Sequence, residues 1–104
     1  MKLTVFERIT LLNVLGYFQG DFTTLKIVRE LKESLSFTEE EHKALDLRIE
    51  NGQAYWISEA DEAKDIPVGD KAAEIIREQL TGLNERKMLT DDHYSLYVKF
   101  VEAN

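Results

Sequence analysis

A chain of 104 residues is long enough for one hydrophobic core, and we expect a single domain over residues 1–104. The chain contains no cysteine, which excludes a disulfide framework and a thiolate metal site. Residues 1–8 lack the uninterrupted apolar run of a signal peptide, and no segment reaches the roughly 18 apolar residues of a membrane span. The sequence therefore predicts a cytoplasmic protein without a membrane partner.

The formal net charge of −7 is concentrated in the middle of the chain. Residues 36–70 hold three basic and ten acidic side chains and so carry −7. Residues 1–35 carry +1 and residues 71–104 carry −1. This distribution predicts one acidic surface on an otherwise balanced protein.

Two helices are predicted in the first third of the chain. Thr4 and Glu7 form a capping-box pattern, so the first helix should begin at Thr4 and end near Gly16. Its apolar side chains go almost all the way round, which indicates a central helix or a helix that forms a homodimer. A second, amphipathic helix is predicted from residues 21–24 to residue 35, because its apolar side chains recur at spacings of three and four.

A short third helix and a β-hairpin follow. Thr38 and Glu41 repeat the capping box, and this helix should end near Asp46. The Asn-Gly pair at residues 51–52 favours a two-residue type I′ turn, which predicts a hairpin over residues 47–57. The turn sets four cross-strand pairs: Glu50 with Gln53, Ile49 with Ala54, Arg48 with Tyr55, and Leu47 with Trp56. Alternation then predicts a buried face made of Leu47, Ile49, Ala54 and Trp56.

The remainder of the chain is predicted to be a loop, a short edge strand and two helices. Residues 58–65 are polar and acidic and favour a mobile loop, and residues 66–68 favour an edge strand. Asp70 should cap a fourth helix. Thr90 should cap a last helix with one apolar face made of Tyr94, Tyr97, Val98 and Val101. The predicted fold class is α+β, mainly helical, with about five helices around one β-hairpin in the order α-α-α-β-β-α-α.

No residue pattern indicates catalysis, a metal site or a cofactor. His42 and His93 are the only histidines, and a Glu39–His42 pair is explained as well by a solvated first turn as by a metal. Asp91, Asp92 and His93 fit helix capping better than acid–base chemistry. The five glycines form no phosphate-binding cluster, so we expect a protein that is not an enzyme and uses no cofactor.

The order of three helices and a hairpin resembles a winged helix in the first half of the chain, which would make the protein a DNA-binding transcriptional regulator. In that arrangement the third helix enters the DNA major groove. Here this helix begins with Glu39, Glu40 and Glu41, whereas phosphate contacts require lysine or arginine. The acidic helix therefore argues against nucleic acid as the partner.

The acidic middle third is either a solvated surface or a surface that binds a protein partner. A partner attracted to it would be basic, or would itself bind nucleic acid. Tyr55 and Arg48 lie on the polar face of the predicted hairpin, and both residue types are common in binding hot spots. The candidate partner-binding residues are Glu39, Glu40, Arg48, Glu50, Tyr55, Glu59, Asp61 and Glu62.

Several short motifs resemble a group of small proteins encoded in phages and prophages of Gram-positive bacteria. These motifs are residues 36–41 (SFTEEE), the hairpin ending in Trp56, Leu89-Thr90, His93 and residues 95–97 (SLY). No activity is assigned to that group, so no site residue is transferred. The resemblance implies a small accessory protein in the host cytoplasm that acts by binding.

Overall fold

The computed structural model describes residues 1–103, which form a mainly helical α+β fold as predicted. The helices are α1 (Val5–Leu15), α2 (Phe22–Leu35), α3 (Glu39–Leu45), α4 (Asp70–Glu85) and α5 (Tyr94–Tyr97). The strands are β1 (Lys2–Leu3), β2 (Arg48–Glu50), β3 (Gln53–Tyr55) and β4 (Lys64–Asp65). A 3₁₀ turn, η1, spans Ser58–Ala60, and a second, η2 (Asp91–His93), leads into α5. Similarity to a winged helix is not shown by this element order.

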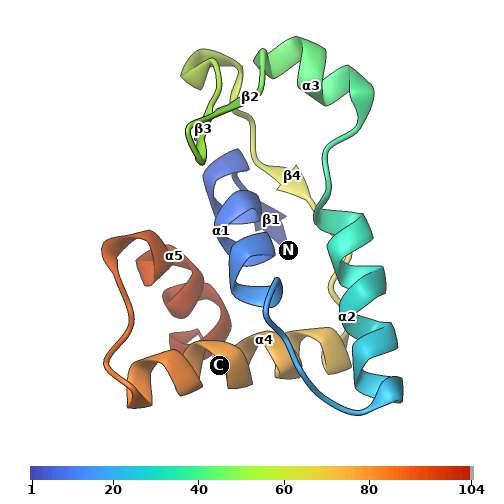
Figure 1. Ribbon diagram of the computed structural model, residues 1–104, viewed down its shortest axis with the longest axis vertical. Helices are drawn as coiled ribbons and strands as arrows, with labels where there is room; N and C mark the ends of the chain where they lie inside the picture. The colour runs from blue at the N-terminus through green and yellow to red at the C-terminus, as the bar shows by residue number, and fades with distance from the viewer. Residues whose placement is uncertain (104) are drawn as a thin grey trace.

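Helix α1 is the central element of the fold, which confirms one of the two alternatives predicted for it (Figure 1). Its first turn has the predicted capping box, in which Thr4 and Glu7 exchange hydrogen bonds of 2.9 and 3.1 Å. Helices α2, α4 and α5 all pack against it, and Leu11 and Leu15 are fully buried. Most of the apolar side chains of α1 therefore pack against other helices of the same chain.

Helix α2 begins within the predicted range, and helix α3 begins at the predicted cap. The carboxylate of Asp21 accepts a hydrogen bond from the amide of Thr24, and Thr38 and Glu41 form the second capping box. Leu31 and Leu35 lie on the buried face of α2 and pack into the core. Helix α3 is short and buries only Leu45, so most of its surface faces solvent.

The hairpin has the predicted turn and register. Strands β2 and β3 pair Arg48 with Tyr55, Ile49 with Ala54, and Glu50 with Gln53. Asn51 and Gly52 both have positive φ, as a type I′ turn requires.

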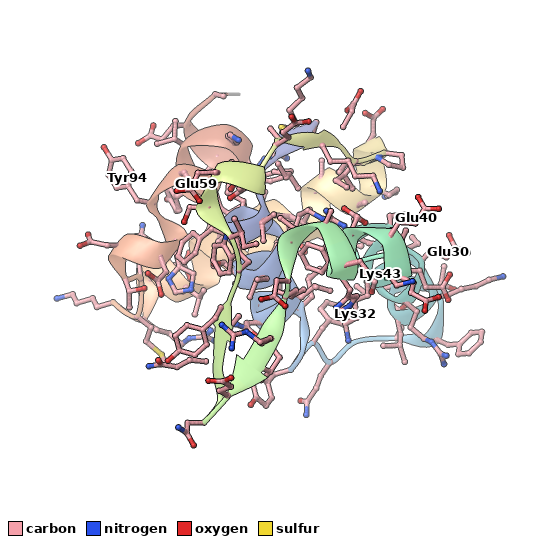
Figure 2. All side chains as sticks on the ribbon, turned by 90° about the horizontal axis from the view of Figure 1, so that it is seen from above. Glu30, Lys32, Glu40, Lys43, Glu59 and Tyr94 are labelled. Carbon is pink, nitrogen blue, oxygen red and sulfur yellow. The ribbon has the colours of Figure 1, made fainter. Side chains whose placement is uncertain are left out.

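The predicted burial of one hairpin face is wrong for its outer half, because Ile49 is 69% exposed. The tip of the hairpin projects away from the helices (Figure 2), and the two strands pack mainly against each other. Trp56, at the base, is half-buried against Phe6 of α1, with ring centroids 6.3 Å apart.

A second small sheet joins residues that were not predicted to pair. Strand β1 runs antiparallel to β4, so the predicted loop over residues 58–65 is ordered as η1 and a strand. The strand predicted over residues 66–68 is therefore displaced towards the N-terminus. Ile66 continues the pairing through two hydrogen bonds: its amide donates to the carbonyl of Met1 at 2.9 Å, and its carbonyl accepts from the amino terminus of Met1 at 3.2 Å. Pro67 has no amide hydrogen to donate.

The fourth helix differs from prediction in its cap and the last helix in its buried face, whereas Thr90 does cap the η2 turn that leads into α5. Gly69 rather than Asp70 is the N-cap residue of α4, and Asp70 is its first helical residue. At the C-terminal end, a π-helical turn (Val98–Glu102) follows α5 and shifts its periodicity. The buried side chains are Leu96 and Phe100, whereas Tyr94 is 72% exposed and Val98 is also exposed. Tyr97 and Val101 do pack against the core, so half of the predicted face is correct.

Candidate functional site

The three segments predicted to bind a partner lie together at one end of the molecule, at the top of Figure 1. The amide of Ile57, just after β3, donates a hydrogen bond of 2.8 Å to the carbonyl of Leu45 in α3. The η1 turn packs against α3. Helix α3, the hairpin and η1 are therefore neighbours.

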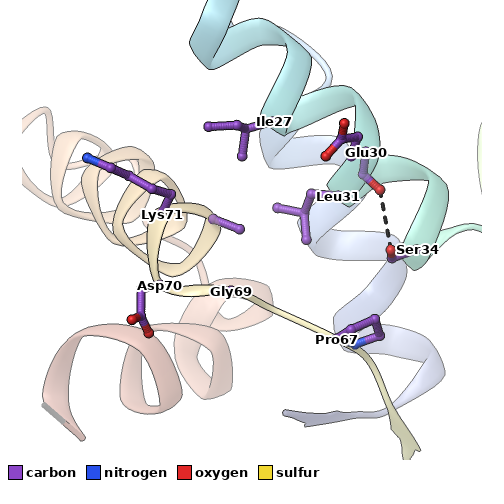
Figure 3. A pocket seen from close by; sticks show the side chains of 9 residues that line it. Ile27, Glu30, Leu31, Ser34, Pro67, Gly69, Asp70 and Lys71 are labelled. Carbon is purple, nitrogen blue, oxygen red and sulfur yellow. Dashed lines mark hydrogen bonds between the residues drawn. The ribbon is translucent and has the colours of Figure 1, made fainter.

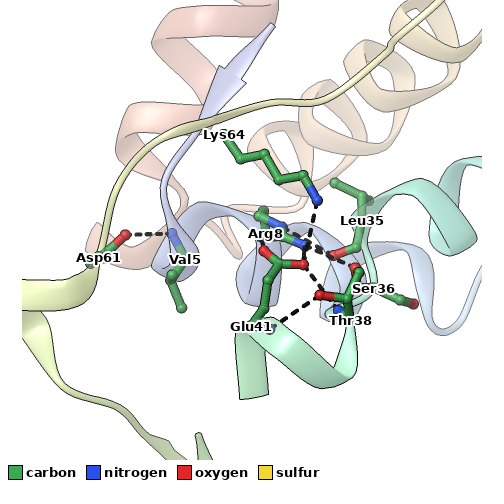
Figure 4. A network of polar contacts seen from close by, with 8 residues as sticks. All are labelled: Val5, Arg8, Leu35, Ser36, Thr38, Glu41, Asp61 and Lys64. Carbon is green, nitrogen blue, oxygen red and sulfur yellow. Dashed lines mark hydrogen bonds and ion pairs between the residues drawn. The ribbon is translucent and has the colours of Figure 1, made fainter. Parts of the chain in front are cut away.

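The three glutamates that open α3 have different roles. Glu39 and Glu40 are exposed, as a partner-binding role requires. Glu41 points inward and forms an ion pair of 2.6 Å with Arg8 of α1 (Figure 4). Part of the predicted acidic surface is therefore used to hold the fold together.

Arg8 is 1% exposed, and sequence reasoning did not identify it. Its Nε donates to the carbonyl of Leu35 at 3.2 Å, and Nη2 donates to the carbonyl of Ser36 at 2.8 Å. These acceptors lie at the carboxyl end of α2, where backbone carbonyls lack helical partners. The ring of Phe37 stacks on the guanidinium at 4.0 Å. The one signal in the sequence was that Arg8 is the single basic residue of a largely apolar helix.

The charge of Glu41 is strongly stabilised. Its hydrogen bond from Arg8 lowers its pKa to about 2, against the opposing effect of burial, and the amide of Thr38 and the charge of Lys64 assist. Lys64 of β4 lies 3.4 Å from the same carboxylate. The Arg8–Glu41 pair thus connects α1, α2, α3 and β4.

Another carboxylate held by an ion pair, that of Glu7, is buried in the first turn of α1, the helix that carries Arg8. Burial by itself would raise the pKa of Glu7, but hydrogen bonds from Lys99 and from the amide of Thr4 hold it below its ordinary value. Lys99 donates to Glu7 at 2.6 Å and to the carbonyl of Lys2 at 2.9 Å. This contact fixes the C-terminal segment to the start of α1.

Asp61, a predicted partner-binding residue, also has a structural contact. Its carboxylate accepts a hydrogen bond of 3.0 Å from the amide of Val5, the first residue of α1 (Figure 4). This amide is one of the first-turn donors that have no partner within the helix. A substitution of Asp61 would therefore disturb α1 as well as any interface.

The other predicted carboxylates are exposed but do not form one cluster. Glu59 and Glu62 follow the hairpin, and both side chains face solvent. Figure 2 shows Glu40 and Glu59 at separate places across this end of the molecule, with Lys43 on the same side as Glu40. The surface is acidic in total, although it also carries Lys43.

The two faces of the hairpin carry different exposed side chains: the pairing places Arg48, Glu50 and Tyr55 on one face and Ile49 on the other. Arg48 forms ion pairs of 3.2 Å with Glu50 and 3.8 Å with Asp46. The hydroxyl of Tyr55 donates to the side chain of Gln53 at 2.9 Å. We define the hairpin surface as the exposed side chains of Arg48, Ile49, Glu50, Tyr55 and Ile57. Ile49 and Ile57 were not among the predicted partner-binding residues, because alternation placed Ile49 in the core.

The largest hollow described, of about 480 Å³, lies between α2 and the start of α4 (Figure 3). Glu30, Asp70 and Lys71 line it together with Ile27 and Leu31. These residues offer no arrangement for catalysis. Within residues 1–103 no three histidine or acidic side chains gather as metal ligands, and no helix in this range is long and apolar enough to span a membrane.

Comparison of the chain with protein-family models, curated proteins and solved structures found no match. The function is therefore inferred from the residues themselves.

Proposed function

We propose that the protein is a non-enzymatic binding protein of the cytoplasm whose hairpin surface contacts a basic protein partner. The observation that carries this proposal is the uncovered hairpin tip, where Ile49 is exposed on one face and the Arg48–Glu50 ion pair lies on the other. Large exposed apolar side chains on an ordered element are typical of a protein interface. An accessory role is also what the resemblance of its short motifs to small phage and prophage proteins implies.

The chemistry of the partner follows from the charges around the hairpin. Arg48 is paired with two carboxylates, Asp46 and Glu50, so its positive charge is more than offset. Glu39, Glu40, Glu59 and Glu62 add further exposed negative charge at the same end. A basic surface would be attracted to this end, and an apolar side chain of the partner would cover Ile49.

The test compares two kinds of variant on the same end of the molecule. An Ile49→Ser, Tyr55→Ser double variant removes the apolar contact, and a Glu59→Lys, Glu62→Lys double variant reverses two charges. Glu78→Lys on α4 is the matched control, since Glu78 is also exposed but lies outside this end. Glu41 and Asp61 are left unchanged because both stabilise the fold.

We expect a partner isolated with the wild-type protein to dissociate faster from the serine variant. It should associate more slowly with the lysine variant, with the difference decreasing as salt rises. Surface plasmon resonance measures both rates. Unchanged rates for both double variants would place the interface elsewhere.

The alternative function, a DNA-binding regulator, is favoured only by the order of α3 and the hairpin. Exposed Glu39 and Glu40 on α3 oppose contact with phosphates. A gel-shift assay with duplex DNA separates the two functions. Binding at low salt that weakens as salt rises would support the regulator, and no binding at any salt would remove it.

A further inference from the structure

A hollow of about 400 Å³ lies at the other end of the molecule from the hairpin, where α1 meets the second half of α4 and the segment before α5. Its volume is within the range of small-molecule sites. The lining residues come from three parts of the chain and are Asn13, Val14, Tyr17, Gln79, Leu83, Arg86, Met88 and His93.

The charge of this hollow is opposite to that of the protein as a whole. None of its eight lining residues is acidic, whereas each of the other four hollows described has at least one carboxylate in its wall. Arg86 forms no ion pair within residues 1–103. A guanidinium without a counter-charge beside an open hollow favours an anion there.

The other polar side chains supply hydrogen-bond donors. The amide of Thr90 donates to Nδ1 of His93 at 2.9 Å, so this nitrogen carries no proton and the neutral ring is protonated at Nε2. Within the part of the chain described, Nε2 of His93 and the polar groups of Asn13, Gln79 and Tyr17 make no hydrogen bond. The hollow thus has unused donors next to its one positive charge.

The rest of the wall is apolar and adds no further positive charge. The hollow can therefore neutralise only a small negative charge on a bound anion. Val14, Leu83 and Met88 offer a surface for an aromatic or aliphatic body. The hollow adjoins the carboxyl ends of α1 and α4, where helix dipoles are negative. A dianion such as a phosphate ester would be disfavoured with only Arg86 to neutralise it, whereas a monoanion is matched.

We propose that this hollow binds a small organic monocarboxylate, with its carboxylate on the guanidinium of Arg86 and its apolar body against Val14, Leu83 and Met88. This site is separate from the hairpin surface, so it does not depend on the proposed protein partner.

The test uses phenylacetate as the probe and phenylacetamide, its neutral analogue of nearly the same shape. Both are titrated into the ¹⁵N-labelled full chain, and amide chemical shifts are followed by NMR. We expect phenylacetate to shift the signals of residues 13–17, 79–88 and 93. It should also bind about tenfold more tightly than phenylacetamide.

Two variants isolate the charge of Arg86. Arg86→Gln should remove the preference for the carboxylate, so that the two probes bind equally. Lys87→Gln removes the same charge from the adjacent residue, which does not line the hollow, and should keep the preference. Both side chains are exposed, and circular dichroism checks that both variants fold.

Three results would overturn the proposal: no shifts at these residues, equal affinity of the wild-type protein for both probes, or an equal effect of the two substitutions.

Discussion

Arg8 and Glu41, which are 33 residues apart in the chain, are joined by two hydrogen bonds of 2.6 and 3.3 Å. The same guanidinium binds the last carbonyls of α2, so one side chain of α1 holds the end of α2 and the start of α3. The hairpin follows α3 directly and is tied to it through Ile57 and Leu45. The placement of the hairpin surface therefore depends on a buried ion pair far from its tip.

Glu41→Gln should lower the free energy of unfolding by about 3 kcal/mol, because Arg8 would keep a buried charge without a counter-charge. Urea denaturation measures the loss. Glu40→Gln removes the same charge from the adjacent exposed position and should change stability by less than about 0.5 kcal/mol. Equal losses in both variants would show that the ion pair contributes no net stability.

Stability should also decrease in acid. The pKa of Glu41 is about 2 in the folded protein, against an ordinary value of 4.5. Because the folded pKa is the lower one, this carboxylate stabilises the fold above pH 4.5, and the contribution is lost as the pH falls from there towards about 2. The lowered pKa of Glu7 acts in the same direction.

Thermal unfolding at several pH values in this window tests the prediction. The wild-type protein should lose more stability on acidification than Glu41→Gln, which has no carboxyl group to titrate at this position. Parallel losses in the two proteins would contradict the lowered pKa of Glu41.

The same substitution should have opposite effects at two glycines. Gly82 lies within α4, and apart from its chain neighbours and the adjacent backbone of the helix no atom lies within 4 Å of the position that an added methyl group would occupy. Gly82→Ala should therefore stabilise the protein by about 0.5–1 kcal/mol through helix propensity. Gly52 has a φ of +77° in the hairpin turn, and Gly52→Ala should destabilise by about 1 kcal/mol. Thermal denaturation gives both signs, and a shift of the same sign in both variants would refute the backbone argument.

Two residues of the last helical segment should respond very differently to truncation. Leu96 is fully buried, and Leu96→Ala should cost about 3 kcal/mol of unfolding free energy. Tyr94→Ala should cost less than about 1 kcal/mol, since this side chain faces solvent. Denaturant titration measures both values. A larger loss for Tyr94→Ala than for Leu96→Ala would show that Tyr94 is buried, as the sequence predicted.

Local patterns predicted the local structure well. Both capping boxes, at Thr4 and Thr38, and the Asn-Gly turn depend on residues within four positions of one another, so neighbouring side chains are sufficient to specify them. The order of helices and hairpin follows from these signals, and the structure confirms it.

Contacts between distant residues could not be predicted in this way. Nothing near Lys64 in the sequence indicates that it pairs with Leu3, and nothing near Glu41 indicates that its partner is Arg8. The exposure of Ile49 depends likewise on which other elements pack against the hairpin, which the alternation of the hairpin does not encode. Among the candidate site residues, Asp61 was assigned to a surface role for the same reason.

The central position of α1 also determines when the protein can fold. This helix precedes every other helix that packs on it. Glu7 can form its ion pair only with Lys99, which lies 92 residues further along the chain. Local helix formation is fast, but contacts over such separations add the entropy of closing long loops. We therefore expect slower folding than in a helical bundle with sequential contacts, and during synthesis α1 should remain unprotected until the C-terminal segment has left the ribosome.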